Sequence, residues 1–191
     1  MGIQNMGMVL LAAGIALCMF EYTLEFGATQ AHMGSVKIFK LAGLLSLVQA
    51  ALLLLSILFS ILILQTDQPF WTNKILHGII TALLLYYALT VLKGAVKGDG
   101  FEERRQGEPQ LREIFRQGLR AGGKTFAAGM AAWYLGRHNL WQPLSLWAVL
   151  FAAAAGGLMY GFWYGTRWRK QICFAEGILL LLMGLGVFVR R

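Results

Sequence analysis

Residues 41–64 read LAGLLSLVQAALLLLSILFSILIL, a run that contains no charged side chain. A helix that crosses a membrane needs about 20 consecutive, mostly apolar residues, and this run is longer than that. It lacks the alternation of apolar and polar positions that is typical of a strand in a membrane barrel. Its polar interruptions are Ser46, Gln49, Ser56 and Ser60. Residues 41–64 therefore predict one membrane-spanning helix.

The composition of the whole chain also indicates a membrane protein. Of its 191 residues, 58% are hydrophobic and 14% are charged, and the mean hydropathy is +0.60. A soluble domain carries about 25% charged residues. This composition excludes a disordered chain, a fibre, a disulfide scaffold and most soluble enzymes. Cys18 and Cys173 form no CxxC pair and imply no disulfide.

Five further stretches predict spans, which gives six in total. The weakest lies within residues 118–135, because Lys124 interrupts it. The other predicted spans are residues 6–26, 41–64, 75–92, 144–164 and 172–189. We expect an all-α membrane protein whose six transmembrane helices form two three-helix repeats, residues 1–97 and 113–191, joined by a cytoplasmic linker, residues 98–112. An odd number of spans in each repeat inverts the second copy, as in many secondary transporters.

The positions of lysine and arginine predict the orientation. With the N-terminus outside, the inner segments carry thirteen basic residues and the outer segments four. Basic residues concentrate on the cytoplasmic side of membrane proteins, so we expect a plasma-membrane protein with both termini outside. The net charge of +8 then reflects topology, and nucleic acid is not an expected partner. The expected partners are the lipid bilayer and a second copy of the chain or another membrane protein.

Basic residues recur every four positions from Arg112 through Arg116 and Arg120 to Lys124, so that they share one helix face. One interpretation is a solvated face that anchors the helix at anionic lipid headgroups. The other is a ramp that attracts anions into the bundle.

Ionisable residues inside the predicted spans mark a candidate site. A charge near the middle of a bilayer costs at least about 2.5–3.5 kcal/mol, so these residues are expected to face the bundle interior and to find partners. Cys18, Glu21 and Glu25 share one face of the first span because they are spaced i, i+3, i+7. Three charged residues of other spans, Lys93, Lys124 and Glu176, are expected at the same cytoplasmic depth. The candidate transport-site residues are therefore Cys18, Glu21, Glu25, Lys93, Lys124 and Glu176.

Two interpretations of these residues stay open. One is a cation site in which Glu21 and Glu25 are metal ligands, joined by Glu176 and Cys18. Carboxylates suit Mn²⁺, Mg²⁺ or Ca²⁺, whereas a thiolate favours softer ions. The other is a structural ion-pair cluster in which the two lysines neutralise the glutamates, favoured because Lys124 repels a divalent cation. A sealed ion pair between Lys124 and a glutamate of the first span would favour the structural role, and a water-filled cavity lined by these residues would favour transport.

The sequence contains no phosphate-binding loop, nucleophile elbow or HExxH motif. We therefore expect neither an enzyme nor a bound cofactor.

Three stretches carry a resemblance to a known family. They are GLMYGFWYGTRWRKQICFAEGILLLLMGLGVFV (157–189), AGIALCMFEYTLEFGA (13–28) and NKILHGIITALLLYYALTVLKGAVKG (73–98). They resemble the last two spans, the opening helix and the third span of the manganese efflux pump (MntP-like) family, within the LysE-type exporter group. The resemblance implies a small secondary transporter with six spans that exports a divalent cation such as Mn²⁺.

The chain departs from that family at its intramembrane positions. The family usually carries an aspartate in the first and the fourth span, where this chain has Cys18 and Lys124, and Lys93 replaces an acidic residue in the third. Three explanations remain: the site is rewired for another ion, the lysine acts as an internal cation, or the chain no longer transports. In the third case the chain would be a structural or interaction subunit, for example in a sporulation-associated branch.

Overall fold

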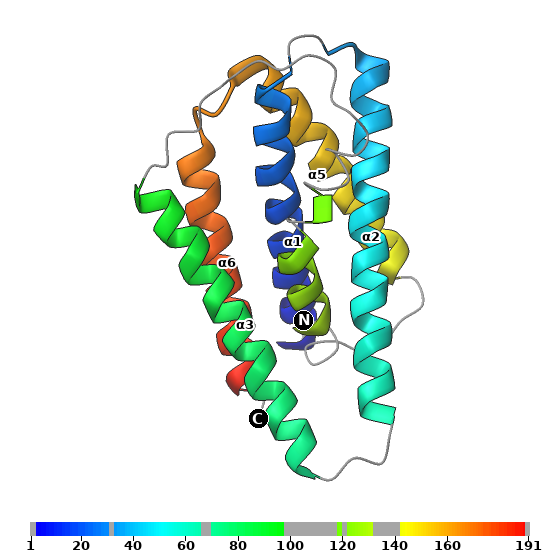
Figure 1. Cartoon of the computed structure of the whole chain (residues 1–191), viewed down its shortest axis with the longest axis vertical. Helices are drawn as coiled ribbons and strands as arrows, with labels where there is room; N and C mark the ends of the chain where they lie inside the picture. Colours follow the sequence, from blue (N-terminus) through cyan, green and yellow to red (C-terminus); the bar gives the residue numbers. More distant parts are fainter. Residues whose placement is uncertain are drawn as a thin grey trace.

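The computed structural model describes residues 3–30, 33–65, 70–97, 118–119, 122–131 and 142–189. Five long helices are α1 (Ile3–Ala28), α2 (Ser35–Gln65), α3 (Phe70–Lys97), α5 (Gln142–Tyr164) and α6 (Arg169–Val189). They run up and down as one bundle, and residues 122–131 form a shorter helical segment (Figure 1). Five of the predicted spans fall on the five long helices. Of the weakest, residues 118–135, the described part includes the segment 122–131, whereas residues 120, 121 and 132–135 lie outside the described residues. The linker 98–112, together with Arg112, Arg116 and Arg120, lies outside the described residues.

Four helical stretches are long and apolar enough to cross a membrane: Ser35–Leu62, Lys74–Lys97, Ser145–Tyr164 and Arg169–Val189. Large apolar side chains such as Leu54, Leu58 and Leu62 are exposed on the outside of the bundle. A soluble protein rarely leaves so extensive an apolar surface to water. The all-α prediction is therefore confirmed for the described residues, and four of its helices fit membrane spans.

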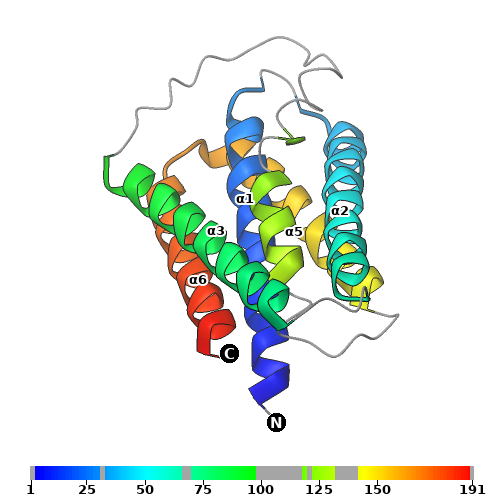
Figure 2. The same cartoon turned by 60° about the horizontal axis from the view of Figure 1, so that its bottom comes forward.

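The helix α1 occupies the centre of the bundle (Figures 1 and 2). It packs on α5 and α6, while α3 pairs with α6 and α2 with α5. The approach to α5 is close because Gly157 and Gly161 carry no side chain. A Cβ atom on Gly161 would overlap the backbone oxygen of Leu24. Small residues at such a contact allow membrane helices to approach closely.

The helical segment 122–131 packs against α2 in the same manner. A Cβ atom on Gly122 would overlap the Leu52 side chain, and one on Gly129 would overlap Ser56. Gln49 of α2 donates from its Nε2 atom to the backbone oxygen of Gly118 at 3.0 Å. The polar interruptions noted in α2 are all buried: Ser46, Gln49, Ser56 and Ser60. These polar residues therefore face the bundle interior, away from lipid.

The helix α1 begins, and α6 ends, at the same end of the bundle (Figure 1). At the opposite end α5 turns into α6 through Gly165, whose φ of 62° favours glycine. The Gly165 amide closes α5 on the Gly161 oxygen at 2.9 Å, and α6 begins four residues later at Arg169. Seven basic residues of the described ranges lie at or near the helix ends on this second side: Lys37, Lys40, Lys93, Lys97, Arg167, Arg169 and Lys170.

Candidate functional site

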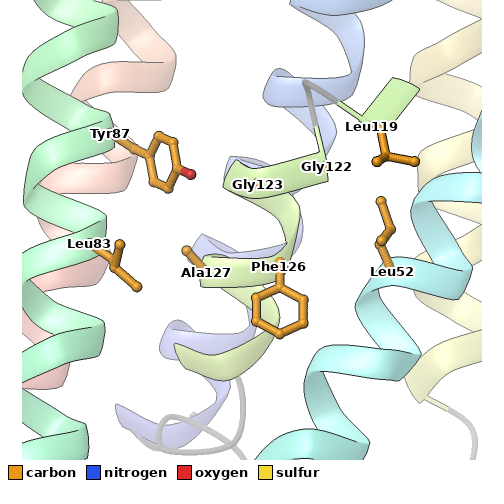
Figure 3. A pocket seen from close by; sticks show the side chains of 8 residues that line it. All are labelled: Leu52, Leu83, Tyr87, Leu119, Gly122, Gly123, Phe126 and Ala127. Atoms are coloured by element: carbon orange, nitrogen blue, oxygen red, sulfur yellow. The ribbon is translucent and has the colours of Figure 1, made fainter. Parts of the chain in front are cut away.

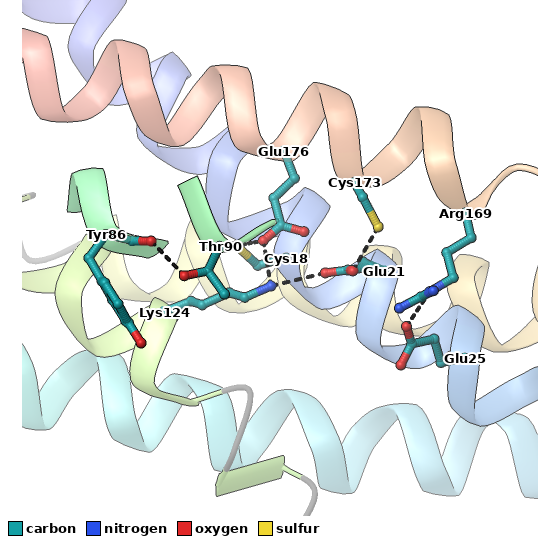
Figure 4. Close-up of polar contacts among 9 residues, drawn as sticks. All are labelled: Cys18, Glu21, Glu25, Tyr86, Thr90, Lys124, Arg169, Cys173 and Glu176. Atoms are coloured by element: carbon teal, nitrogen blue, oxygen red, sulfur yellow. Dashed lines mark hydrogen bonds and ion pairs between the residues drawn. The ribbon is translucent and has the colours of Figure 1, made fainter. Parts of the chain in front are cut away.

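The candidate site is formed by one face of α1 and one face of α6, and a lysine reaches it from residues 122–131 (Figure 4). Seven side chains take part: Cys18, Glu21 and Glu25 from α1, Lys124, and Arg169, Cys173 and Glu176 from α6. The spacing i, i+3, i+7 on α1 and i, i+4, i+7 on α6 places each set on a single helix face. The two helices pack directly on each other, so these faces meet.

Lys124 bridges two carboxylates from different helices. Its Nζ atom donates to Glu21 Oε2 at 3.0 Å and to Glu176 Oε1 at 2.9 Å. The Glu176 side chain is fully buried, whereas the Glu21 and Lys124 side chains keep 13% and 23% of their surface exposed. Taking charges out of water is costly, and removing one partner of such a pair leaves the other uncompensated. The three side chains therefore depend on one another.

Both cysteines donate to the same two carboxylates. The Cys18 Sγ atom donates to Glu176 Oε1 at 3.1 Å, and the Cys173 Sγ atom donates to Glu21 Oε1 at 2.8 Å. Both thiols are free and buried. Each carboxylate thus receives the shared ammonium and one thiol, and the thiols carry their protons in this arrangement.

The cluster around Lys124 sets two carboxyl groups, those of Glu21 and Glu176, against one ammonium. The Oε2 atom of Glu176 is buried and has no hydrogen-bond partner among the described residues. An unsatisfied buried acceptor costs about 1–3 kcal/mol, and more when it is charged. The cluster therefore has the capacity to take up a further donor or positive charge.

A second ion pair lies one helical turn nearer the basic end. Arg169 donates from Nε to Glu25 Oε1. The two side chains are 25% and 27% exposed, so water reaches this pair more readily than the Lys124 cluster. The turn at Gly165 sets the start of α6 and hence the position of Arg169. The pair neutralises Glu25 within the site.

The structure brings together four of the predicted residues, Cys18, Glu21, Lys124 and Glu176, and places Glu25 beside them. Lys93 lies apart from them: it is exposed near the end of α3 and, within the described ranges, forms no ion pair with these glutamates.

Sequence reasoning missed two members of the site, Cys173 and Arg169. It used Arg169 only to infer topology and Cys173 only to judge disulfides. The available signal was their spacing from Glu176, which repeats on α6 the one-face pattern already noted on α1.

No metal-ready arrangement of three or more histidine, cysteine, aspartate or glutamate side chains occurs in the described part of the chain. The ammonium of Lys124 lies between the two buried carboxylates (Figure 4). A cavity of about 250 Å³ lies elsewhere, between α2, α3, Leu119 and residues 122–127 (Figure 3). Its lining, which includes Leu83, Tyr87 and Phe126, is mostly apolar and contains none of the site's charged groups. The role of Glu21 and Glu25 as metal ligands stays a prediction.

Long apolar helices around a buried group of charges define a multi-span helical membrane protein. Intramembrane charges of this kind are expensive and are associated with substrate or ion pathways.

Comparison with known proteins agrees with this class. Two curated proteins are similar to the chain, each named "Putative manganese efflux pump MntP", from Bifidobacterium longum strains DJO10A and NCC 2705. Each is 26% identical over 117 residues, which cover 60% of this chain and 60% of the relative. The chain thus matches about three fifths of the length of these relatives. No family model and no solved structure matches it.

Proposed function

We propose that the chain is a secondary transporter that exports a divalent cation across the plasma membrane, with Mn²⁺ as the first candidate. The observation that carries the proposal is the Lys124 cluster, in which two carboxyl groups inside the bundle, from α1 and α6, share one ammonium. The names of the two relatives support the choice of cargo. Membrane helices retain charges at this cost mainly where ions or substrates pass.

In this mechanism Lys124 is an internal cation. While the site is empty of cargo, its ammonium holds Glu21 and Glu176 together and offsets their repulsion. A divalent cation that enters from the cytoplasm takes over the carboxylates and repels the ammonium, which withdraws. After the cation leaves on the other side, the ammonium returns to the carboxylates. Lys124 thus keeps the unloaded cluster closed.

The proposal includes six spans arranged as two inverted repeats, and the packing supports this arrangement. In the two proposed repeats α1 is equivalent to residues 122–131, α2 is equivalent to α5, and α3 is equivalent to α6. The contact of α1 with α5 then corresponds to the contact of residues 122–131 with α2, and both are made through glycines. The contact of α1 with α6 corresponds to that of Gly123 with Tyr87 of α3.

A second correspondence comes from α3 and α6. Aligning HGII, from His77, with EGIL, from Glu176, makes Leu85 equivalent to Gly184. These two positions lie against each other, since a Cβ atom on Gly184 would be 3.5 Å from the Leu85 side chain. Equivalent residues meet in this way when they lie on a two-fold axis, which is what an inverted repeat requires.

We also propose that both termini lie outside the cell. The start of α1 and the end of α6 share one end of the bundle (Figure 2). Most of the described basic residues lie at or near the helix ends on the other side. Among the described residues, the termini's end carries Lys74. The positive-inside rule then assigns the basic end to the cytoplasm.

A second candidate function is a transport-inactive membrane subunit with a structural or interaction role. The observation that favours it is the pairing of Lys124 with Glu21 and Glu176, which ties three helical segments together. An ion pair sealed from solvent would favour a structural role. The Lys124 side chain is 23% exposed, however, so this ion pair is not sealed from solvent.

Expression in cells that lack their own manganese exporter distinguishes the two functions. Transport predicts that the wild-type chain lowers intracellular Mn²⁺ and restores growth at toxic Mn²⁺ concentrations. Glu21→Gln should abolish this effect, while Glu25→Gln, in the more exposed pair, should largely retain it. No change in intracellular Mn²⁺ from a chain shown to reach the membrane would reject manganese export and favour the structural function.

A further inference from the structure

The proposed transport cycle gives no role to the apolar cavity between α2 and α3 (Figure 3). The cavity has a volume of about 250 Å³. Leu52 of α2 lies across it from Leu83 and Tyr87 of α3, and the segment that carries Lys124 lies between the two helices. An apolar cavity of about 150 Å³ already accepts a molecule of the size of benzene. This cavity is therefore large enough to take up part of an apolar ligand.

The cavity opens toward the lipid-facing surface of the bundle. Two of its lining residues keep a large exposed fraction, 36% for Leu83 and 53% for Leu119. The helices α2 and α3 both fit membrane spans, and they pack on different partners, α5 and α6. Water is a poor occupant, because a water molecule needs about two to four polar partners and the lining is mostly apolar. In a membrane, the apolar molecules at such an opening are the acyl chains of lipids.

One face of α3 connects the cavity to the basic end of the bundle. The residues of this face follow the spacing i, i+4, i+7, i+11, i+14 and are Leu83, Tyr87, Thr90, Gly94 and Lys97. Thr90 and Lys97 are exposed, and a Cβ atom on Gly94 would meet nothing within 4 Å. Among the described residues, this face therefore leaves room for a chain that runs along α3 from its basic end to the cavity.

The basic end of α3 carries two exposed lysines one helical turn apart, Lys93 and Lys97. The ion pairs of the candidate site use neither of them. Lys97 lies ten residues beyond Tyr87, which is about 15 Å along the helix. The hydrocarbon core of a bilayer is about 30 Å thick, so this distance matches the depth of one leaflet. A lipid with its headgroup at these lysines can thus place an acyl chain in the cavity.

We propose that the cavity holds one acyl chain of an anionic phospholipid whose headgroup binds Lys93 and Lys97. The apolar lining recognises the chain, and the two ammonium groups recognise the negative charge of the headgroup. Basic side chains next to a membrane span attract anionic lipids in this way. The lipid belongs to the leaflet at the basic end of the bundle, because both lysines lie there.

The position of the cavity connects the lipid to the cation site. Four of the lining residues flank Lys124 in the sequence: Gly122, Gly123, Phe126 and Ala127. In the proposed cycle Lys124 withdraws from its two carboxylates, and an acyl chain packed against this segment stabilises the arrangement in which the lysine is paired. Only this effect on transport rests on the proposed function, because the lipid site itself is argued from the cavity and the lysines.

Photo-crosslinking of the purified full-length protein in detergent tests the site. The probe is phosphatidylglycerol that carries a diazirine in one acyl chain, and the adducts are mapped by peptide mass spectrometry. We expect adducts on residues 83–87 and 122–127. Each basic residue near an anionic lipid contributes a factor of about five in affinity, so unlabelled phosphatidylglycerol should compete at least about fivefold better than phosphatidylcholine.

A variant that fills the cavity tests the place of the acyl chain. Leu83→Trp should remove most of the adducts at residues 122–127, because the indole occupies the space of the chain. Leu89→Trp is the matched control, since Leu89 is 62% exposed on another face of α3 and does not line the cavity. This control should keep the wild-type adducts.

A variant without the two lysines tests the place of the headgroup. Lys93→Gln combined with Lys97→Gln should abolish the preference for phosphatidylglycerol over phosphatidylcholine. Lys170→Gln, at an exposed position of α6, should retain it. If Leu83→Trp does not fold, the wild-type adduct map and the lysine variants still decide the question.

Adducts spread over all exposed faces of the spans, or equal competition by the two lipids, would overturn the proposal. Crosslinks between two copies of the chain at residues 83–87 would assign the cavity to a second copy and overturn it as well. Its failure is distinguishable from failure of transport. A chain that exports Mn²⁺ without specific labelling retains the proposed function and loses this site, whereas a chain that is labelled as expected but moves no cation retains the site and loses the transport function.

Discussion

Lys124 determines how the buried charges of this chain are compensated. It lies on a short, glycine-rich helical segment that packs on α2, and its side chain reaches across to α1 and α6. The burial of the Lys124 ammonium is tolerated because Glu21 and Glu176 accept hydrogen bonds from it, and the burial of these two carboxyl groups is tolerated because the ammonium lies between them. At the scale of single residues, the site is therefore one coupled unit.

Replacing Lys124 by methionine should destabilise the protein by about 3–5 kcal/mol, because it leaves two buried carboxylates without a counter-charge. The free energy of unfolding in detergent, followed by circular dichroism, measures this loss. Combining Lys124→Met with Glu176→Gln should cost less than the sum of the two single changes, since the partners are coupled. Lys170→Met, on an exposed position, is the matched control. Wild-type stability of Lys124→Met would show that the pair does not stabilise the bundle.

Glu25→Gln should have a much smaller effect, a loss of about 1 kcal/mol or less, because exposed ion pairs contribute little. Glu25 and its partner Arg169 keep about a quarter of their side-chain surface in solvent. The same unfolding measurement compares this variant with Lys124→Met. Equal losses from the two changes would mean that burial does not separate the two ion pairs.

At the scale of helices, glycine contacts set the distances that the charged cluster needs. α5 touches α1 through Gly157 and Gly161, which lets the centre of the bundle form without bulky side chains between the two helices. α1 in turn carries Cys18 and Glu21 toward α6. A change in the spacing of α1 and α5 is therefore expected to disturb the charged residues on the other face of α1.

Gly161→Ala should destabilise the protein by about 1–3 kcal/mol, as overpacking of a tight contact does. The added methyl group would collide with the backbone of α1 at Leu24, which cannot rotate away. Gly78→Ala on α3 is the control, since a Cβ atom there meets nothing within 4 Å. The control should be neutral or stabilising by about 0.5–1 kcal/mol, because alanine is the better helix former. Thermal unfolding of both variants checks the contrast, and similar shifts would contradict it.

Helices were predictable from the sequence, but their ends and rotations were less so. The run 41–64 predicts a span, yet α2 already begins at Ser35 and includes Lys37 and Lys40. Long basic side chains can place their charge at the membrane surface while the backbone stays helical, so charge does not mark the helix end. Apolar side chains surround most of each helix, which leaves little signal for the face that turns inward.

The candidate site, too, was predictable only in part from the sequence. The one-face spacing of Cys18, Glu21 and Glu25 and the depth of Lys124 follow from periodicity and topology. The pairing of Lys124 with both Glu21 and Glu176 joins residues 103 and 52 positions apart. Such pairing depends on helix rotation and on the glycine contacts, which a single sequence does not reveal.

At the scale of the whole molecule, the uneven distribution of basic residues sets an orientation that labelling can check. Lys170→Cys, at the basic end, should react with a membrane-impermeant maleimide only after cells are permeabilised. Lys74→Cys, at the end that carries the termini, should react on intact cells. The native Cys18 and Cys173 are buried, so the background should be low. The reverse labelling pattern would place both termini in the cytoplasm and invalidate the proposed direction of transport.

The central claim is that a cation passes through the cluster formed by Glu21, Lys124 and Glu176. The most direct measurement is cation flux into proteoliposomes that contain the purified chain, with Mn²⁺ and Zn²⁺ offered separately. The account predicts uptake that Glu21→Gln and Glu176→Gln reduce by about ten- to a hundredfold, the range seen when support of a metal site is lost. Glu25→Gln should stay near the wild type. A flux of neither ion above empty liposomes, or a flux that both substitutions leave intact, would contradict the claim.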